Sequence, residues 1–260
     1  MKAAARYIMA IVFASVVTIY MAATLGAGAA KRHGTSCSGL NIVIRDSLRN
    51  RFVTREDVKS YLDMEKIGYI GMKAGEIDLV KIERAIDSKS AVLKSEAYMT
   101  RDGLLNIEVT QRTPVVQFRK NGGGFYSDAD GYLFPLQRHN PDDILYIDGN
   151  VPLRADSGYK GEAGSQEEKK WLDGILGMIS YIDGHSWLSG KIARMSVLGN
   201  GDIVIYPVEG REKFIFGSPD NIDIKFKRIR YYYSEIVPEK GSGTYSSVNV
   251  KYDGQVICRK

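Results

Sequence analysis

Residues 122–135 of this chain read GGGFYSDADGYLFP, with two aspartates one residue apart ahead of a glycine. Carboxylates at similar spacing occur in EF-hand calcium loops, where a glycine takes the sixth position and a carboxylate the twelfth. With Gly131 at the sixth position, Tyr126 would stand first and Gln137 twelfth. Neither side chain carries a carboxylate, so the sequence excludes an EF-hand loop at this place.

Asp128 and Asp130 are also candidates for an acid pair in catalysis, which needs a base or a nucleophile within hydrogen-bond reach. The neighbouring sequence offers neither. Asp and Gly favour a tight reversal of the chain between two strands. We therefore predict that these residues form the turn of a hairpin between residues 115–126 and 132–135.

Two other short motifs match catalytic ones by letter. Ser157 and Lys160 fit S-x-x-K, but they lie in a polar loop, and no S-D-N or K-T-G motif accompanies them. His185 and Ser186 are adjacent residues, which seldom face each other, and only Asp183 is near enough in sequence to orient the histidine. The G-x-S-x-G, H-E-x-x-H and phosphate-loop motifs are absent from the sequence. We predict that the protein is not an enzyme and uses no cofactor or small-molecule substrate.

Histidine and cysteine do not form a metal-binding pattern. The three histidines, His33, His139 and His185, share no ligand spacing with each other or with Cys37 and Cys258. A disulfide between the two cysteines is permitted outside the cytoplasm. Because two lone cysteines do not make a disulfide framework, we expect two unpaired thiols and no metal site.

The composition is that of a globular protein. Of the 260 residues, 44% are hydrophobic and 26% are charged, and 36 basic against 31 acidic residues give a net charge of +5. A stripe of basic residues interleaved with aromatic ones would indicate nucleic-acid binding. The sequence contains no such stripe, so we expect no nucleic-acid partner.

The segment 7–30 contains no charged residue and is long enough to cross a bilayer, which takes about 20 apolar residues. We predict a single transmembrane anchor here, preceded by a cytoplasmic tail (1–6) and followed by a linker (31–37). The alternative is a cleaved signal peptide, because residues 27–29 (AGA) fit the small-x-small cleavage pattern. The apolar run exceeds the usual signal-peptide core, which favours the anchor.

The first exported stretch has the pattern of an α+β domain. Strands are predicted at residues 40–45, 91–100 and 104–111, with Asp-Gly marking a hairpin between the last two. Helices are predicted to begin at Thr54, which forms an acidic capping box with Asp57, and at Asp78. Two helices would cover one apolar face of a three-stranded sheet.

The remainder is richer in strands. Strand-like runs lie at residues 115–119, 125–135, 144–147, 195–207, 214–216, 247–252 and 255–259, and helices are predicted at 167–181 and 221–237. The second helix is basic around residues 225–230. Its cations would either meet an acidic partner or lipid head groups or form a solvent-exposed face, with Ile222, Phe226, Ile229 and Tyr233 buried.

The last predicted strand, residues 255–259, would have a neighbour on only one side. An open strand edge is a site for strand addition by a partner, whereas most edges are blunted or covered. Val256 and Ile257 leave the strand competent to pair. On the pattern alone, an open edge and an edge covered by a loop are equally compatible with the sequence.

An ordered series of segments resembles the bacterial cell-division family FtsQ/DivIB. The segments are residues 52–58 (FVTREDV), 78–86 (DLVKIERAI), 107–116 (IEVTQRTPVV), 126–134 (YSDADGYLF), 217–228 and 248–256 (VNVKYDGQV). The sequence departs from the family pattern at Gln111, where a glutamate is usual, and at residues 90–92, where proline and tryptophan are common.

The resemblance implies an α+β protein with a POTRA domain (β-α-α-β-β) at 38–112 and a mainly antiparallel β domain with two helices at 113–260. It also implies a non-catalytic bitopic scaffold of the divisome, in the cytoplasmic membrane at the septum, with the bulk of the chain outside the cytoplasm. The alternative is another exported POTRA-containing assembly or secretion protein.

The family's partners are small bitopic coiled-coil proteins, FtsB and FtsL. The resemblance implies that a partner of this kind adds to the last strands of the β domain. The residues carried over to the partner-binding surface are Lys251, Tyr252, Gly254, Gln255, Val256, Ile257, Cys258 and Arg259.

Overall fold

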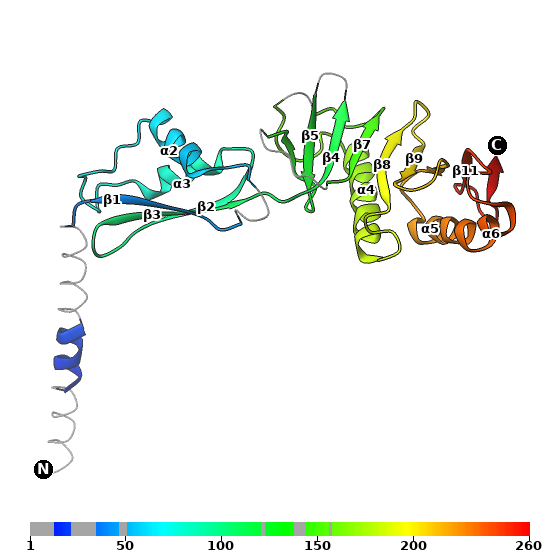
Figure 1. Cartoon of the computed structure of the whole chain (residues 1–260). Helices are drawn as coiled ribbons and strands as arrows, with labels where there is room; N and C mark the ends of the chain where they lie inside the picture. Colours follow the sequence, from blue (N-terminus) through cyan, green and yellow to red (C-terminus); the bar gives the residue numbers. More distant parts are fainter. Residues whose placement is uncertain (1–12, 22–34, 47–50, 121–122, 138–143, 156–157) are drawn as a thin grey trace, which may run out of the picture. The chain divides into compact units, whose positions relative to one another are not determined.

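The computed structural model describes residues 13–21, 35–46, 51–120, 123–137, 144–155 and 158–260, which fall into two compact units, Met1–Gln111 and Arg112–Lys260 (Figure 1). Residues 13–21 are helical, and the rest of the predicted anchor at 7–30 lies outside the described residues. Within the described ranges, no helix has the length and apolar character needed to span a membrane.

The first unit is a three-stranded sheet with two helices. Its elements in chain order are β1 (Gly39–Ile44), α2 (Arg55–Met64), α3 (Leu79–Asp87), β2 (Val92–Met99) and β3 (Leu104–Gln111). The strand order is β1-β3-β2, with β1 parallel and β2 antiparallel to β3. The predicted order of strand, helix, helix, strand, strand is therefore confirmed.

Both helices of this unit begin as the sequence predicts. The Thr54 hydroxyl accepts a hydrogen bond from the Asp57 backbone N–H (3.1 Å), and the Asp57 carboxylate accepts one from the Thr54 N–H (2.9 Å), which completes a capping box. The Asp78 carboxylate accepts from the Lys81 N–H at 2.9 Å. These caps satisfy N–H groups that have no partner inside the helix.

The core of the first unit lies between the helices and one face of the sheet. Its side chains, all fully buried, are Val58, Leu62, Ile82, Ile86, Leu105, Ile107 and Val109. Burying each of them contributes roughly 1.5–3 kcal/mol. The period of the apolar residues along each helix therefore fixes which face meets the sheet.

The second unit is built on a nine-stranded sheet. Its strands are β4 (Pro114–Lys120), β5 (Gly123–Asp128), β6 (Leu133–Pro135), β7 (Tyr146–Gly149), β8 (Ile192–Val197), β9 (Ile203–Pro207), β10 (Lys213–Gly217), β11 (Ser247–Asn249) and β12 (Ile257–Arg259). The order across the sheet is β12-β11-β10-β9-β8-β7-β4-β5-β6. β6 and β12 are the two outermost strands.

The sheet is more mixed than the mainly antiparallel β domain expected from the resemblance. Three neighbouring pairs are parallel, namely β4·β7, β7·β8 and β10·β11, and the other five pairs in the strand order are antiparallel. The two strands of each parallel pair are separated in the chain by other elements. For example, α4 lies between β7 and β8. A parallel pair needs such a crossover.

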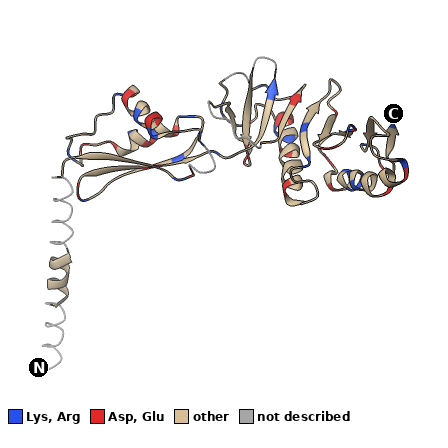
Figure 2. Ribbon diagram, in the orientation of Figure 1, with Lys and Arg blue, Asp and Glu red and all other residues tan. Residues whose placement is uncertain are grey.

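Two helical regions belong to this unit. α4 (Gln166–Gly184) begins at Ser165, whose hydroxyl accepts from the Glu168 N–H. α5 (Ile222–Tyr231) runs without a break into a π-helical turn (Tyr232–Ile236) and then α6 (Val237–Lys240). Figure 2 shows Lys and Arg interspersed with Asp and Glu along these helices. The predicted helices are confirmed, although α4 runs a few residues further.

The Asp128 turn is confirmed as a hairpin, and it joins β5 to β6. The predicted first arm, 115–126, is in fact two strands, β4 and β5. One Asp128 carboxylate oxygen accepts from the N–H groups of Asp130 (3.1 Å) and Tyr132 (2.9 Å), and the other accepts from the Arg112 guanidinium (2.7 Å). Gly131 has φ +81°, a conformation that favours glycine. This carboxylate is therefore part of the fold.

Candidate partner-binding edge

The candidate site lies at the β12 end of the nine-stranded sheet. β11 pairs in parallel with β10, and β12 pairs antiparallel with β11, with Val248 opposite Cys258. The two strands are shorter than predicted, because residues 250–256 form a loop between them. Gly254 lies in that loop with φ +71°, so the reversal of the chain needs a residue without a Cβ.

The structure brings the predicted site residues together as one loop and one strand. Lys251, Tyr252, Gly254, Gln255 and Val256 lie in the loop, and Ile257, Cys258 and Arg259 form β12. Four of these residues are exposed, namely Tyr252, Gly254, Gln255 and Arg259, and the others are partly buried. The set therefore presents both an exposed surface and a strand edge.

Side chains two positions apart on an extended chain share a face. Val256 and Cys258 pack against the hydrophobic core of the unit. Burial raises the pKa of the Cys258 thiol above its usual value, so it stays protonated near neutral pH. Cys258 and Cys37 are both unpaired, and Cys37 lies in the other unit.

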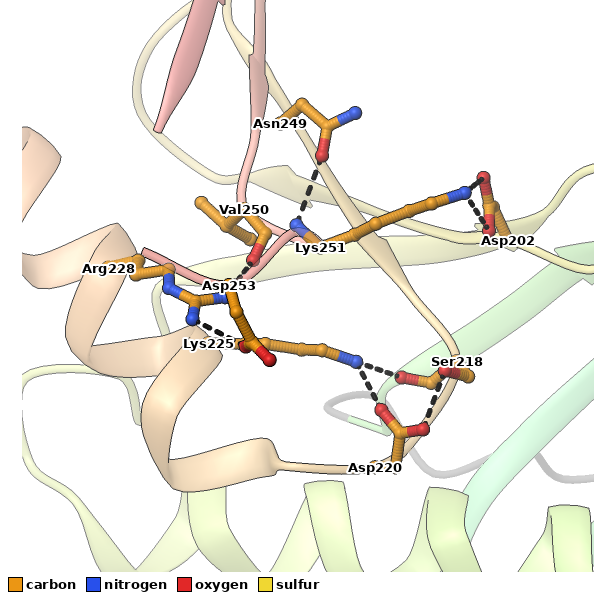
Figure 3. A network of polar contacts seen from close by, with 9 residues as sticks. All are labelled: Asp202, Ser218, Asp220, Lys225, Arg228, Asn249, Val250, Lys251 and Asp253. Atoms are coloured by element: carbon orange, nitrogen blue, oxygen red, sulfur yellow. Dashed lines mark hydrogen bonds and ion pairs between the residues drawn. The ribbon is translucent and has the colours of Figure 1, made fainter. Parts of the chain in front are cut away.

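The loop is fastened to α5 by Arg228 (Figure 3). The guanidinium of Arg228 donates to the backbone carbonyl of Val250 at 2.9 Å and to the carboxylate of Asp253 at 2.8 Å. The Arg228 side chain is only 13% exposed, whereas that of Asp253 is 88% exposed. The bond to the carbonyl is thus the better shielded of the two, and it fixes where β11 ends.

Lys251 fastens the same loop to the β8–β9 hairpin. Its ammonium lies 2.9 and 3.1 Å from the two carboxylate oxygens of Asp202, and its backbone N–H donates to the Asn249 side chain at 3.0 Å (Figure 3). The hydrogen bond to Asp202 raises the pKa of Lys251. The loop therefore has one attachment to a helix and another to a hairpin.

Lys225 was missed by the sequence argument. Both alternatives for the basic helix place its cations at the surface, but Lys225 is only 4% exposed. Its ammonium donates to the Ser218 carbonyl at 2.9 Å and pairs with Asp220, whose pKa this contact lowers (Figure 3). The predicted burial of Tyr233 is also wrong, since it is 39% exposed. An apolar period indicates which residues share a helix face, and it does not indicate which polar groups ahead of the helix fold back onto it.

The two outermost strands of the sheet differ in what lies beyond them. At Leu133 in β6, the N–H donates to the Gly161 carbonyl (2.8 Å) and the carbonyl accepts from the Gly161 N–H (2.9 Å). Within the described ranges, the backbone of β12 bonds only toward β11. The outer edge of β12 therefore offers unpaired backbone donors and acceptors to another strand.

The polar groups around this edge are engaged in holding the fold. In the part of the chain that the structure describes, no three His, Cys, Asp or Glu side chains gather as metal ligands would. Asp202, Asp220 and Asp253 each face a lysine or arginine. These carboxylates are therefore part of the contacts that hold this end of the unit together.

Comparison with known proteins gives two matches that together cover most of the chain. A family model described as "FtsQ/DivIB, C-terminal related" matches residues 113–259, and one described as "POTRA-like domain" matches residues 35–110. No curated protein matches the chain.

Proposed function

The chain belongs to the FtsQ/DivIB family, and from this premise we propose that it is a non-catalytic scaffold of the bacterial division machinery. In this proposal it binds a partner by strand addition at the outer edge of β12. The family match and the POTRA-like match support the general role. The observation that carries the site is the outer edge of β12, whose backbone bonds only toward β11 among the described residues.

The partner is an extended segment that continues the sheet. Backbone hydrogen bonds would supply affinity, and side chains on alternate positions would supply specificity. Val256, just before β12, and Cys258, within it, are partly buried and pack against the hydrophobic core. A partner strand with apolar residues at every second position would extend that packing. The partner class proposed is the FtsB/FtsL-like bitopic coiled-coil protein.

The surface around the edge is preformed in this proposal. Lys251 and Asp253 fasten the loop before β12 through Asp202 and Arg228. A partner strand would then meet an ordered edge and would lose less conformational entropy on binding. Tyr252, Gly254 and Gln255 lie on the exposed part of the same loop and form the rest of the proposed contact.

The membrane location is a further part of the proposal. The apolar run at 7–30 supplies a single span, with the cytoplasmic tail at 1–6, a linker at 31–37, the POTRA domain at 38–112 and the β domain at 113–260 outside the cytoplasm. The protein would reside in the cytoplasmic membrane and collect at the division septum. A fluorescent fusion should then concentrate at midcell, and depletion should give filamentous cells.

A pull-down of the full chain from membranes tests the proposed binding. Small bitopic coiled-coil proteins should be recovered with the wild type and lost with Val256→Pro and Ile257→Pro, because proline cannot donate a backbone hydrogen bond and disturbs pairing. Ile257→Thr is the matched control, since it keeps the N–H and a β-branched side chain. Equal recovery by Ile257→Pro and Ile257→Thr would contradict binding at this strand.

A further inference from the structure

The second unit contains a pocket of about 210 Å³ that neither the family assignment nor the proposed strand addition uses. It lies between the sheet at β8–β10, the helix α5 with its π-helical turn, and the turn that follows α4. Apolar pockets with a few converging polar groups are the usual places where proteins bind small molecules. Its size, walls and mouth together define a class of ligand.

The floor of the pocket is rigid and apolar. Ile205, Phe214, Phe226 and Ile229 line it, and each is at most 3% exposed. These side chains also belong to the main core of the unit. Because cores are packed as densely as organic crystals, this floor has a fixed shape before any ligand arrives.

Two aromatic side chains stand at the walls. Trp187 meets Phe226 edge-on, with ring centroids 6.5 Å apart and an interplanar angle of 83°. Tyr233 packs on Phe214 at 5.5 Å. Its ring also meets Tyr232 at 5.3 Å, so two aromatic neighbours set its position although the side chain is partly exposed. Such walls favour an aromatic ring, which stacks offset or edge-to-face on them.

The position of Tyr233 depends on an irregular turn. Residues Tyr232–Ile236 are π-helical, between α5 and α6. Single π-helical turns inside α-helices are rare and occur frequently at functional sites. Here the turn contributes Tyr233 to the wall of the pocket.

The mouth of the pocket carries one cation and one anion. Lys191 and Glu209 both line it and are exposed. They lie on adjacent segments, because the N–H of Val208 donates to the carbonyl of Lys191 at 2.8 Å. No ion pair in the described part of the chain includes either residue. Both charges are therefore available to a ligand.

The volume limits the ligand to a single ring. An apolar cavity of roughly 150 Å³ holds one benzene molecule, and drug-sized ligands occupy pockets of roughly 300 Å³ or more. We propose that this pocket binds a small zwitterion with one aromatic ring, of the chemical class of the free aromatic amino acids. The ring lies on the floor between Trp187 and Tyr233, the ligand carboxylate faces Lys191, and the ligand ammonium faces Glu209.

Tryptophan fluorescence tests this proposal on the full chain. The chain has two tryptophans, so Trp171→Phe leaves Trp187 as the sole reporter at the pocket wall. Adding L-phenylalanine should change the Trp187 emission saturably, with half-saturation on the order of 1 mM for a ligand of about a dozen atoms. L-Alanine, which has the same charged head without the ring, should give no saturable change.

Two rim variants and a neutral ligand test the role of the charges. Lys191→Met and Glu209→Gln should each weaken phenylalanine binding about tenfold, because each removes one charged contact at an exposed site that the fold does not need. N-acetyl-phenylalaninamide keeps the ring but lacks both charges, so it should bind at least tenfold more weakly. Absence of a saturable change with L-phenylalanine, or equal binding by the wild type and both rim variants, would overturn the proposal.

Discussion

The two outermost strands of the nine-stranded sheet differ in whether their outer edge is covered. At one end β6 is covered, because Gly161 exchanges two backbone hydrogen bonds with Leu133. At the other end β12 has no described neighbour beyond it, while the loop before it is fastened by Arg228 and Lys251. A covered edge is protected from association, and an open edge on an ordered strand is able to accept a partner.

The covered end shows what protection requires. The carboxylate of Glu168, in the first turn of α4, accepts hydrogen bonds from the N–H groups of Arg154 and Gly164, which flank the segment that contains Gly161. The first unit uses a similar device, since the Glu83 carboxylate accepts the Ala97 N–H of β2 at 2.8 Å. In both cases the acceptor of the backbone N–H group is a buried or partly buried carboxylate. At the outer edge of β12, the described residues provide no such carboxylate.

The largest effect should come from breaking the β5–β6 turn. Asp128→Ala removes an ion-pair partner of Arg112, whose side chain is only 13% exposed, and leaves two N–H groups without their acceptor. We expect the free energy of unfolding to fall by about 3–5 kcal/mol, measured by urea denaturation. Asp130→Ala, at the exposed position two residues on, is the control and should change it by less than about 0.5 kcal/mol. Similar losses for both variants would refute the structural role of Asp128.

At the open end, Arg228→Met should lower the free energy of unfolding by about 1.5–3 kcal/mol, because it leaves the Val250 carbonyl without its charged donor. Backbone amides of β12 should also exchange faster with solvent, since the loop before the strand loses its attachment to α5. Asp253→Asn is the control. It disturbs only the exposed part of the contact, so unfolding should change by less than about 0.5 kcal/mol. Unchanged exchange in Arg228→Met would show that β12 is ordered without this contact.

Glu168→Ala should lower the free energy of unfolding by about 1–2 kcal/mol, because it removes the acceptor of two backbone N–H groups at the covered end. The amides of Leu133 and Gly161 should exchange faster, and the chain should self-associate at high concentration as the β6 edge opens. Amide exchange and sedimentation velocity measure the two effects. Glu167→Ala, at the exposed neighbouring position, should leave the sedimentation profile unchanged. Faster exchange at β12 instead of Leu133 would contradict this assignment.

The smallest effect at neutral pH concerns Tyr232, which lies in the core close to Cys258. Burial, and then the charge of Glu212, raise its pKa from 10.0 to about 12. The folded state holds this proton more tightly than the unfolded state. The contribution of the Tyr232 proton to the free energy of unfolding is therefore complete below pH 10, and it is lost as the pH rises toward 12. Tyr232→Phe should flatten the loss of stability between pH 10 and 12. A pH profile identical to that of the wild type would contradict the pKa shift.

Features that depend on neighbours in sequence were predicted well. The Thr54–Asp57 capping box, the Asp78 cap and the Asp128 turn each join residues within four positions, and the alternating pattern located β3 (Leu104–Gln111) to the residue. The family match also agrees with the resemblance inferred from ordered motifs.

Contacts that lie outside the apolar period were not predictable from it. Lys225 is buried because Ser218 and Asp220, seven and five positions before it, fold back onto α5, and no apolar period encodes that contact. The sequence left open whether an edge of the last strand is covered, because covering depends on pairings such as Leu133 with Gly161, 28 positions apart (161 − 133). The parallel pairing of β10 with β11 likewise depends on a helical crossover.

Amide hydrogen exchange on the complex recovered from membranes tests the central claim most directly. Successive N–H groups of a strand point to opposite edges, and in β12 those of Ile257 and Arg259 face Asn249 and Ser247 of β11. If a partner adds a strand at the open edge, the outward-facing amide of Cys258 should become protected when the partner is bound. The amides of β6 and β2 should not change. Protection confined to β6, β2 or the helices, with β12 exchanging as in the free protein, would contradict the account.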